Sequence, residues 1–191
     1  KSNINYLVYA PESGSQRTLK KIKKRVKLKR LIESVIEAKR LGLTVRTNVI
    51  IGFPHETWWD IIQTILFQMR NAIRGVDDVT IYIFSPYPGT EIFDDLTRAG
   101  KVKLNDDYFL KLTSLNGDYF TTKLTTFNEN ISGRMLGVVR LVAVLINYAI
   151  SYLLYPRRII RTIRNIYSTN AATVFEHRLK DFLNRRKLPT T

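Results

Sequence analysis

The chain has 191 residues, and a hydrophobic content of 45% is enough to bury one sizeable core. The absence of cysteine excludes a disulfide framework and a thiolate metal site, and two histidines far apart in sequence make a histidine metal cluster improbable. The formal charge is +15, and residues 131–191 supply much of it, with 11 basic and 2 acidic side chains giving +9. We predict neither a metal site nor a hydrolase triad.

Three strand–turn–helix units fill the first hundred residues. Strands are expected at 4–10, 44–51 and 79–84, because each is a short run of strand-forming residues followed by a turn that contains Gly or Pro. Apolar residues at helical spacing predict helices at 16–23, 28–41, 58–73 and 91–98. Strand and helix in alternation indicate an α/β fold with parallel strands and right-handed crossovers. Three such strands are half of a barrel or half of a doubly wound sheet.

The turns that follow the strands are the candidate ligand site, because such folds bind ligands where parallel strands end. They read YAPESGS at 9–15, GFPHET at 52–57 and SPYPGT at 85–90. Glu12 can accept hydrogen bonds from a ribose or an ammonium group, and Gly14 permits close backbone approach. The simpler interpretation is that Ser13 or Ser15 only caps the next helix. Asn48 is either a ligand contact or a satisfied core amide.

A lysine-rich segment and an apolar segment stand out beyond these turns. Residues 20–30 carry eight basic side chains, which either bind phosphates or nucleic acid or form a solvated helix face and its connector. Residues 101–130 are expected to hold a short helix at 105–115 and a Thr-rich connector. Residues 135–155 contain one charge, Arg140, and arginines follow them. This stretch suits a helix packed on the sheet, a helix in the membrane interface or a membrane span.

Three motifs resemble, in the same order, the second half of a radical S-adenosylmethionine enzyme. They are ESGS with Leu19 and the lysine-rich turn, then NVIIGFPHET, then SPYPGTEIFD, and together they cover about residues 4–95. The likeness is greatest to the cobalamin-dependent branch. It implies half of a partial (β/α)6 barrel at 1–100, a connector at 101–130 and a basic, apolar helical extension at 131–191. His55 departs from the family pattern, which usually has glycine there.

The resemblance also implies which residues bind the cofactor. Glu12, with Ser13 beside it, would contact the ribose or methionyl part of S-adenosylmethionine, and Lys24 would pair with its carboxylate. Asn48 would reach the ribose hydroxyls. The backbone near Ile50 and Gly52, and that following Phe84, would line the adenine.

The same resemblance implies cofactors that this chain does not hold by itself. A [4Fe–4S] cluster needs cysteine thiolates, which the family places in a loop upstream of the region matched here. A cobalamin domain would lie further upstream. We therefore expect a C-terminal piece of a longer cytoplasmic enzyme, inactive alone and partnered by the missing N-terminal half.

Three functions remain open from the sequence. The leading one is reductive cleavage of S-adenosylmethionine for methyl transfer, C–H functionalisation or ring formation on a small-molecule or lipid-like substrate. A radical enzyme that modifies transfer RNA would suit the basic charge, but the apolar residues 135–155 disfavour nucleic acid. The non-catalytic alternative is a basic α/β module that binds membrane or nucleic acid. Peripheral membrane contact, at the inner face, is expected through 134–164.

Overall fold

The computed structural model describes residues 4–117, 126–167 and 173–185. Its centre is a parallel sheet of three strands in the order β1 (Tyr6–Glu12), β2 (Thr44–Ile51) and β3 (Asp78–Ile83). The predicted strands agree with these to within two residues at each end. The pairing of β1 with β2 is irregular between Tyr9 and Glu12, so the last part of β1 leaves the regular ladder just before the predicted site.

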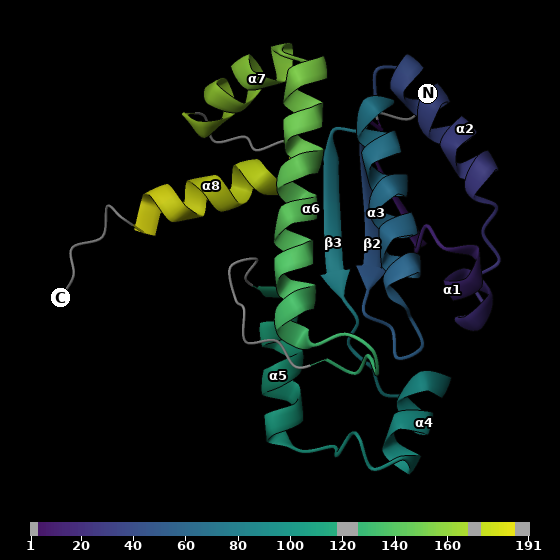
Figure 1. Cartoon of the computed structure of the whole chain (residues 1–191). Coiled ribbons are helices and arrows are strands. Elements are labelled where there is room, and N and C mark those ends of the chain that lie inside the picture. Colours follow the sequence, from purple (N-terminus) through teal and green to yellow (C-terminus); the bar gives the residue numbers. More distant parts are fainter. Residues whose placement is uncertain (1–3, 118–125, 168–172, 186–191) are drawn as a thin grey trace.

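Eight helices lie within the described residues (Figure 1). They are α1 (Gln16–Lys21), α2 (Leu28–Arg40), α3 (Trp58–Ile73), α4 (Glu91–Arg98), α5 (Asp106–Gly117), α6 (Gly133–Leu154), α7 (Arg157–Ile166) and α8 (Val174–Arg185). The Thr-rich part of the predicted connector, at 118–125, lies outside the described residues. The predicted division at residues 100 and 130 stays a prediction.

The main core lies between one face of the sheet and three helices. Helix α2 packs on β1 and β2, α3 packs on β2 and β3, and α6 packs on β3 and α3. Alternate residues of β2 point into this core, among them Val45, Val49 and Ile51, which are fully buried. Burial of this layer supplies the main driving force for the fold.

The opposite face of the sheet is open mainly at β1 and β2. At β3, Asp78 and Thr80 are buried on this face, and the backbone N–H of Val174 in α8 donates to Asp78 at 2.9 Å. Tyr6 and Val8 of β1 are exposed, and Arg46, Asn48 and Ile50 of β2 are only half-buried. A sheet that is covered on one face and partly open on the other is compatible with part of an α/β barrel, whose strands face inward on the open side. The structure thus confirms the α/β class with parallel strands.

A smaller apolar cluster closes the carboxyl end of the sheet. It is built from Phe53 and Phe84, which follow β2 and β3, and from Phe93, Leu96 and Tyr108 of α4 and α5. Figure 1 shows α4 and α5 beyond the tips of the strand arrows, and α7 at the other end of α6. The candidate site lies beside this cluster.

Helix α6 is the apolar segment expected at 135–155, and it packs on the sheet. Among the described residues, α6 is the single helix that is long and apolar enough to cross a membrane, judged by length and composition only. Its polar stripe faces inward: Arg140, Asn147 and Ser151 are all buried. The structure therefore agrees with the packed-helix alternative.

Candidate functional site

A cavity of about 540 Å³ opens at the carboxyl ends of the strands. This volume lies in the range of pockets that hold small molecules or cofactors. The lining residues come from the end of β1, the segment after α1, the ends of β2 and β3 and the start of α4. They include Glu12, Ile22, Lys24, Ile50, Phe53, Tyr82, Phe84, Ser85, Tyr87 and Thr90. Four of the seven residues predicted to bind the cofactor line this one cavity: Glu12, Lys24, Ile50 and Phe84.

Glu12 and Lys24 form an ion pair at the rim of this cavity, with 3.0 Å between Lys24 Nζ and Glu12 Oε1. Both side chains keep part of their surface exposed. Glu12 has a φ of +71°, a left-handed conformation that is uncommon for a residue other than glycine. Lys23 has a φ of +57° and directs the chain toward Lys24 at the end of α1. Two strained turns therefore hold one acidic and one basic group together at the cavity.

The wall of the cavity next to this pair is apolar and aromatic. Ile50 is the last residue of β2 on the open face, and Phe53 and Phe84 follow β2 and β3. The rings of Phe53 and Phe84 lie 4.8 Å apart between centroids, tilted by 38°. A flat apolar wall beside a charged pair suits a ligand with a flat ring at one end and charges at the other.

Glu56 holds the GFPHET turn in shape. Its Oε2 accepts hydrogen bonds from the backbone N–H of Gly52 at 2.7 Å and of Phe53 at 3.1 Å, and its Oε1 accepts one from the hydroxyl of Thr18 at 3.2 Å. Burial of the carboxyl group raises the pKa of Glu56 to about 7, although these donors oppose the shift. Glu56 does not line the cavity, so it positions the turn and does not contact a ligand there.

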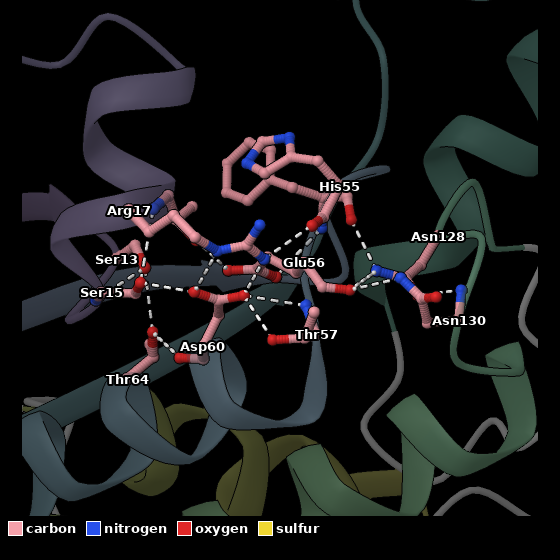
Figure 2. A network of polar contacts seen from close by, with 12 residues as sticks. Ser13, Ser15, Arg17, His55, Glu56, Thr57, Asp60, Thr64, Asn128 and Asn130 are labelled. Carbon is pink, nitrogen blue, oxygen red and sulfur yellow. Dashed lines mark hydrogen bonds and ion pairs between the residues drawn. The ribbon is translucent and has the colours of Figure 1, made fainter.

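Asp60 ties the same turn to the loop after β1 (Figure 2). Its Oδ2 accepts from the backbone N–H of Thr57 at 2.8 Å and from the Thr57 hydroxyl at 2.7 Å, and its Oδ1 accepts from Ser15 at 2.7 Å. Arg17 forms an ion pair with it and also donates to the carbonyl of His55 at 2.9 Å. Hydrogen bonding from Arg17 holds the pKa of Asp60 well below its usual range.

A third clamp on this turn comes from a distant part of the chain. The side-chain amide of Asn128 donates to the carbonyl of Phe53 at 2.6 Å and to that of Glu56 at 2.9 Å. Asn130 donates to the carbonyl of Glu56 at 3.1 Å (Figure 2). The turn is thus fixed from α1, from α3 and from the segment before α6, and it is a rigid element of the site.

The remaining predicted residues lie near the cavity without lining it. Ser13 is buried, its hydroxyl lies 2.9 Å from that of Thr64, and the Ser15 N–H donates to it. Ser15 caps α1, as the simpler interpretation held. Asn48 lies on the open face of β2, where its Oδ1 accepts from Arg46 Nε at 2.8 Å. Its amide nitrogen has no hydrogen-bond partner among the residues that the structure describes, so it can still donate to a ligand.

Gly52 is required by the backbone and by packing. Its φ is +86°, and a Cβ on it would lie 2.7 Å from Leu136 Cδ1. Its N–H is occupied by Glu56. Gly52 therefore shapes the turn that carries Ile50 and Phe53, and direct contact with adenine stays a prediction.

Sequence reasoning assigned no role to Glu56, Asp60, Arg17 or Asn128. A signal for one of them is present in the sequence, since Thr57 and Asp60 have the spacing of a capping box and the structure contains that box. Arg17 and Asn128 bind partners that are distant in sequence, and no local pattern points to them. Glu56 bonds to Gly52 and Phe53 within its own turn. His55, which departs from the family pattern, has a lowered pKa because it is partly buried, and its ring stacks on Phe53.

Comparison with known proteins gives two partial matches. No protein-family model matches the chain. It is 33% identical over 91 residues to a presumed methylthiotransferase from Methanocaldococcus jannaschii, a match that covers 48% of this chain and 20% of that protein. It is 36% identical over 83 residues to an uncharacterised methyltransferase from Pyrococcus horikoshii, covering 44% of this chain and 17% of that protein. The matches thus span about a fifth of these curated relatives, and both relatives are named as transferases of methyl or methylthio groups.

Proposed function

We propose that this chain is the C-terminal half of the barrel of a radical S-adenosylmethionine enzyme and supplies one side of its S-adenosylmethionine site. The observation that carries the proposal is the Glu12–Lys24 pair, held by two left-handed residues at the rim of a cavity with an aromatic wall. The ordered motifs and the names of the two partial relatives support it.

The residues present fit S-adenosylmethionine by their chemistry. Its amino-acid end is a zwitterion, and an acidic and a basic group 3.0 Å apart offer one partner for the ammonium and one for the carboxylate. The aromatic side chains Phe53 and Phe84 offer a surface for adenine. Asn48 keeps an amide nitrogen that can donate to a ribose hydroxyl.

An iron–sulfur cluster does not fit this chain as its sole host, because the sequence has no cysteine. We propose that the cluster ligands lie in another part of a longer protein. When bound together, a reduced cluster and S-adenosylmethionine supply one-electron cleavage of the sulfonium, which starts chemistry at a substrate C–H bond. The residues of this chain bind and orient the cofactor: Lys24 fixes its carboxylate, Glu12 its ammonium or ribose, and the clamped GFPHET turn keeps the aromatic wall in place.

The kind of enzyme within this class is a finer proposal. Methyl or methylthio transfer agrees with the names of both relatives, whereas C–H functionalisation without group transfer rests on the motifs alone. A cobalamin requirement likewise rests only on the likeness of the motifs to the cobalamin-dependent branch. A small-molecule or lipid-like substrate is a proposal that rests on the sequence alone.

Direct binding of S-adenosylmethionine tests the proposal. The complete protein that carries this chain would be titrated with S-adenosylmethionine in a calorimeter, as wild type and as Glu12→Gln and Lys24→Ala. We expect each variant to bind at least about tenfold more weakly, a loss of about 1.4 kcal/mol, because one charge-assisted contact is removed.

The matched control is Lys20→Ala, which removes an exposed lysine of the same segment that does not line the cavity. The control should bind like the wild type. Equal affinity in Glu12→Gln, Lys24→Ala and the wild type would contradict the proposed site. Salt-sensitive binding of nucleic acid without any binding of S-adenosylmethionine would favour the non-catalytic module instead.

A further inference from the structure

The outward surface of α3 and α6 is apolar over most of its length. Helix α6 is apolar on both sides. It buries most of its polar residues against the sheet together with Leu136 and Val144, and it also exposes a row of apolar residues on its outward side. Helix α3 packs beside α6 and is exposed at Ile62, Leu66 and Ile73. We call these three residues, together with Met135, Val138, Val142, Leu145, Ile146 and Leu153 of α6, the outer apolar face.

Helix α7 follows α6 at one end of this face and has an exposed apolar arc of its own. Arg158 and Thr162 point inward and are buried, whereas Ile159, Ile160 and Ile163 form an exposed apolar arc, with Ile160 at 69% exposure. Ile166 lies on the same arc by helical spacing. Such a helix, with one anchored side and one exposed apolar side, is typical of elements that lie in a membrane interface.

Positive charges border the outer apolar face. Arg157 and Arg164 are exposed next to the apolar arc of α7, and Arg70 and Arg74 are exposed at the nearby end of α3. The hydroxyl of Tyr155 donates to the carbonyl of Ile73 at 2.8 Å, which brings the ends of α3 and α6 together. The sequences of α6 and α7 contain no acidic residue.

The geometry points to a lipid surface as the occupant: we infer that the outer apolar face and the exposed arc of α7 dock in the plane of an anionic bilayer. The uncharged centre would enter the boundary between headgroups and acyl chains, and the bordering arginines would meet the lipid phosphates. Nucleic acid fits this surface less well, because its phosphates require cations across the contact and not only at the border.

A transmembrane orientation of α6 does not agree with the contacts. Tyr148 donates to Asp78, Asn147 and Ser151 face inward, and Ser151 accepts from Arg158. A span would have to break these contacts and place Arg140 in hydrocarbon, which is costly. Contact in the plane of the membrane keeps the packing of α6 on the sheet unchanged.

Flotation with lipid vesicles tests the inference. The full chain would be mixed with vesicles of phosphatidylcholine containing phosphatidylglycerol, and separately with pure phosphatidylcholine, and floated through a density gradient. We expect binding to the anionic vesicles that weakens with added salt, and weaker binding to neutral vesicles. Val142→Glu and Ile160→Glu should each reduce binding at least about tenfold, because each removes one apolar insertion and adds a negative charge.

Two matched controls separate this face from the rest of the surface. Leu41→Glu changes an exposed leucine at the end of α2, over the opposite edge of the sheet, and should leave flotation unchanged. Arg98→Gln removes an exposed arginine of α4 and should also have no effect, whereas Arg164→Gln should weaken binding to anionic vesicles. Circular dichroism of each variant would show that the fold is retained.

Three results would overturn the inference. The first is the absence of flotation in the wild type, and the second is equal flotation of the wild type, Val142→Glu and Ile160→Glu. The third is a wild type that does not bind vesicles but forms a concentration-dependent dimer, with Val142→Glu and Ile160→Glu both abolishing the dimer. A second copy of the chain would then cover the outer apolar face. The lipid contact and the cofactor site lie on different faces, so either can fail without the other.

Discussion

The carboxyl end of the sheet and the outer helical layer place polar and apolar groups in opposite ways. At the carboxyl end, a polar network of Glu56, Asp60 and Asn128 is buried behind the cavity, and the cavity itself offers one charged pair on an apolar wall. In the outer layer, α6 buries Arg140, Asn147 and Ser151 and exposes a row of apolar side chains.

The difference separates groups that maintain the structure from groups that await a partner. The network of Glu56, Asp60 and Asn128 is hydrogen-bonded within the chain, so its loss should lower stability. The charged pair and the outer apolar face have no complete partner among the described residues, so their loss should lower binding and leave the fold intact. The following predictions test this division, beginning with the largest effect.

Arg158→Ala should destabilise the chain most, by about 3–5 kcal/mol, because it leaves the buried carbonyls of Gly75 and Val76 without their donor. Asp77 keeps Lys39 and Arg161 as partners. The guanidinium of Arg158 donates to the carbonyl of Val76 at 2.9 Å and to that of Gly75 at 2.6 Å, and lies 3.2 Å from Asp77. Chemical denaturation would measure the loss. Arg164→Ala on the exposed side of α7 is the control, and a similar loss there would show that burial is not the cause.

Glu56→Gln should change how stability depends on pH. The pKa of Glu56 is about 7 in the folded chain, above the ordinary value of 4.5, so the unfolded state loses its proton first as pH rises. Its contribution to the free energy of unfolding is therefore full below about pH 4.5 and falls by about 3 kcal/mol by pH 7. Urea denaturation across this window should show the decline in the wild type relative to Glu56→Gln. Parallel pH profiles would contradict the burial of an ionisable Glu56.

Gly14→Ala should cost about 2–3 kcal/mol, because overpacking forces the surroundings to move. A Cβ at Gly14 would lie 2.6 Å from Phe67 Cβ and 2.8 Å from Thr64 Cα, in the contact between the loop after β1 and α3. Gly100→Ala is the matched control. A Cβ at Gly100 would meet open space, but the φ of +69° is strained for alanine, so this change should cost about 1 kcal/mol. Thermal melts that rank the two variants the other way would contradict the close packing of this loop.

Leu145→Gln should have the smallest effect, within about 0.5 kcal/mol, because Leu145 is 58% exposed on the outward side of α6. Denaturation would show little change, and solubility should rise. A large loss of stability would mean that the outer apolar face is covered within the chain itself.

Much of the fold and part of the site could be predicted from the sequence, because both depend on patterns of residues that are close together in the chain. The strand expected at 44–51 is β2 without change. Glu12 and Lys24, which the motifs single out, line one cavity, and their binding of a cofactor stays a prediction. The inward orientation of Arg140 could not be predicted, since a polar stripe usually faces water. The hydrogen bonds that hold the GFPHET turn could not be predicted either, because Arg17, Thr18 and Asn128 are distant from it in the sequence.

The most direct test of the central proposal is the cleavage of S-adenosylmethionine by the complete protein that carries this chain. Its iron–sulfur cluster would be rebuilt without oxygen, S-adenosylmethionine and a reductant added, and 5′-deoxyadenosine measured for the wild type, Glu12→Ala and Asn48→Ala. We predict product from the wild type and a steep fall in both variants. No 5′-deoxyadenosine from a protein with an intact cluster would contradict the proposed function.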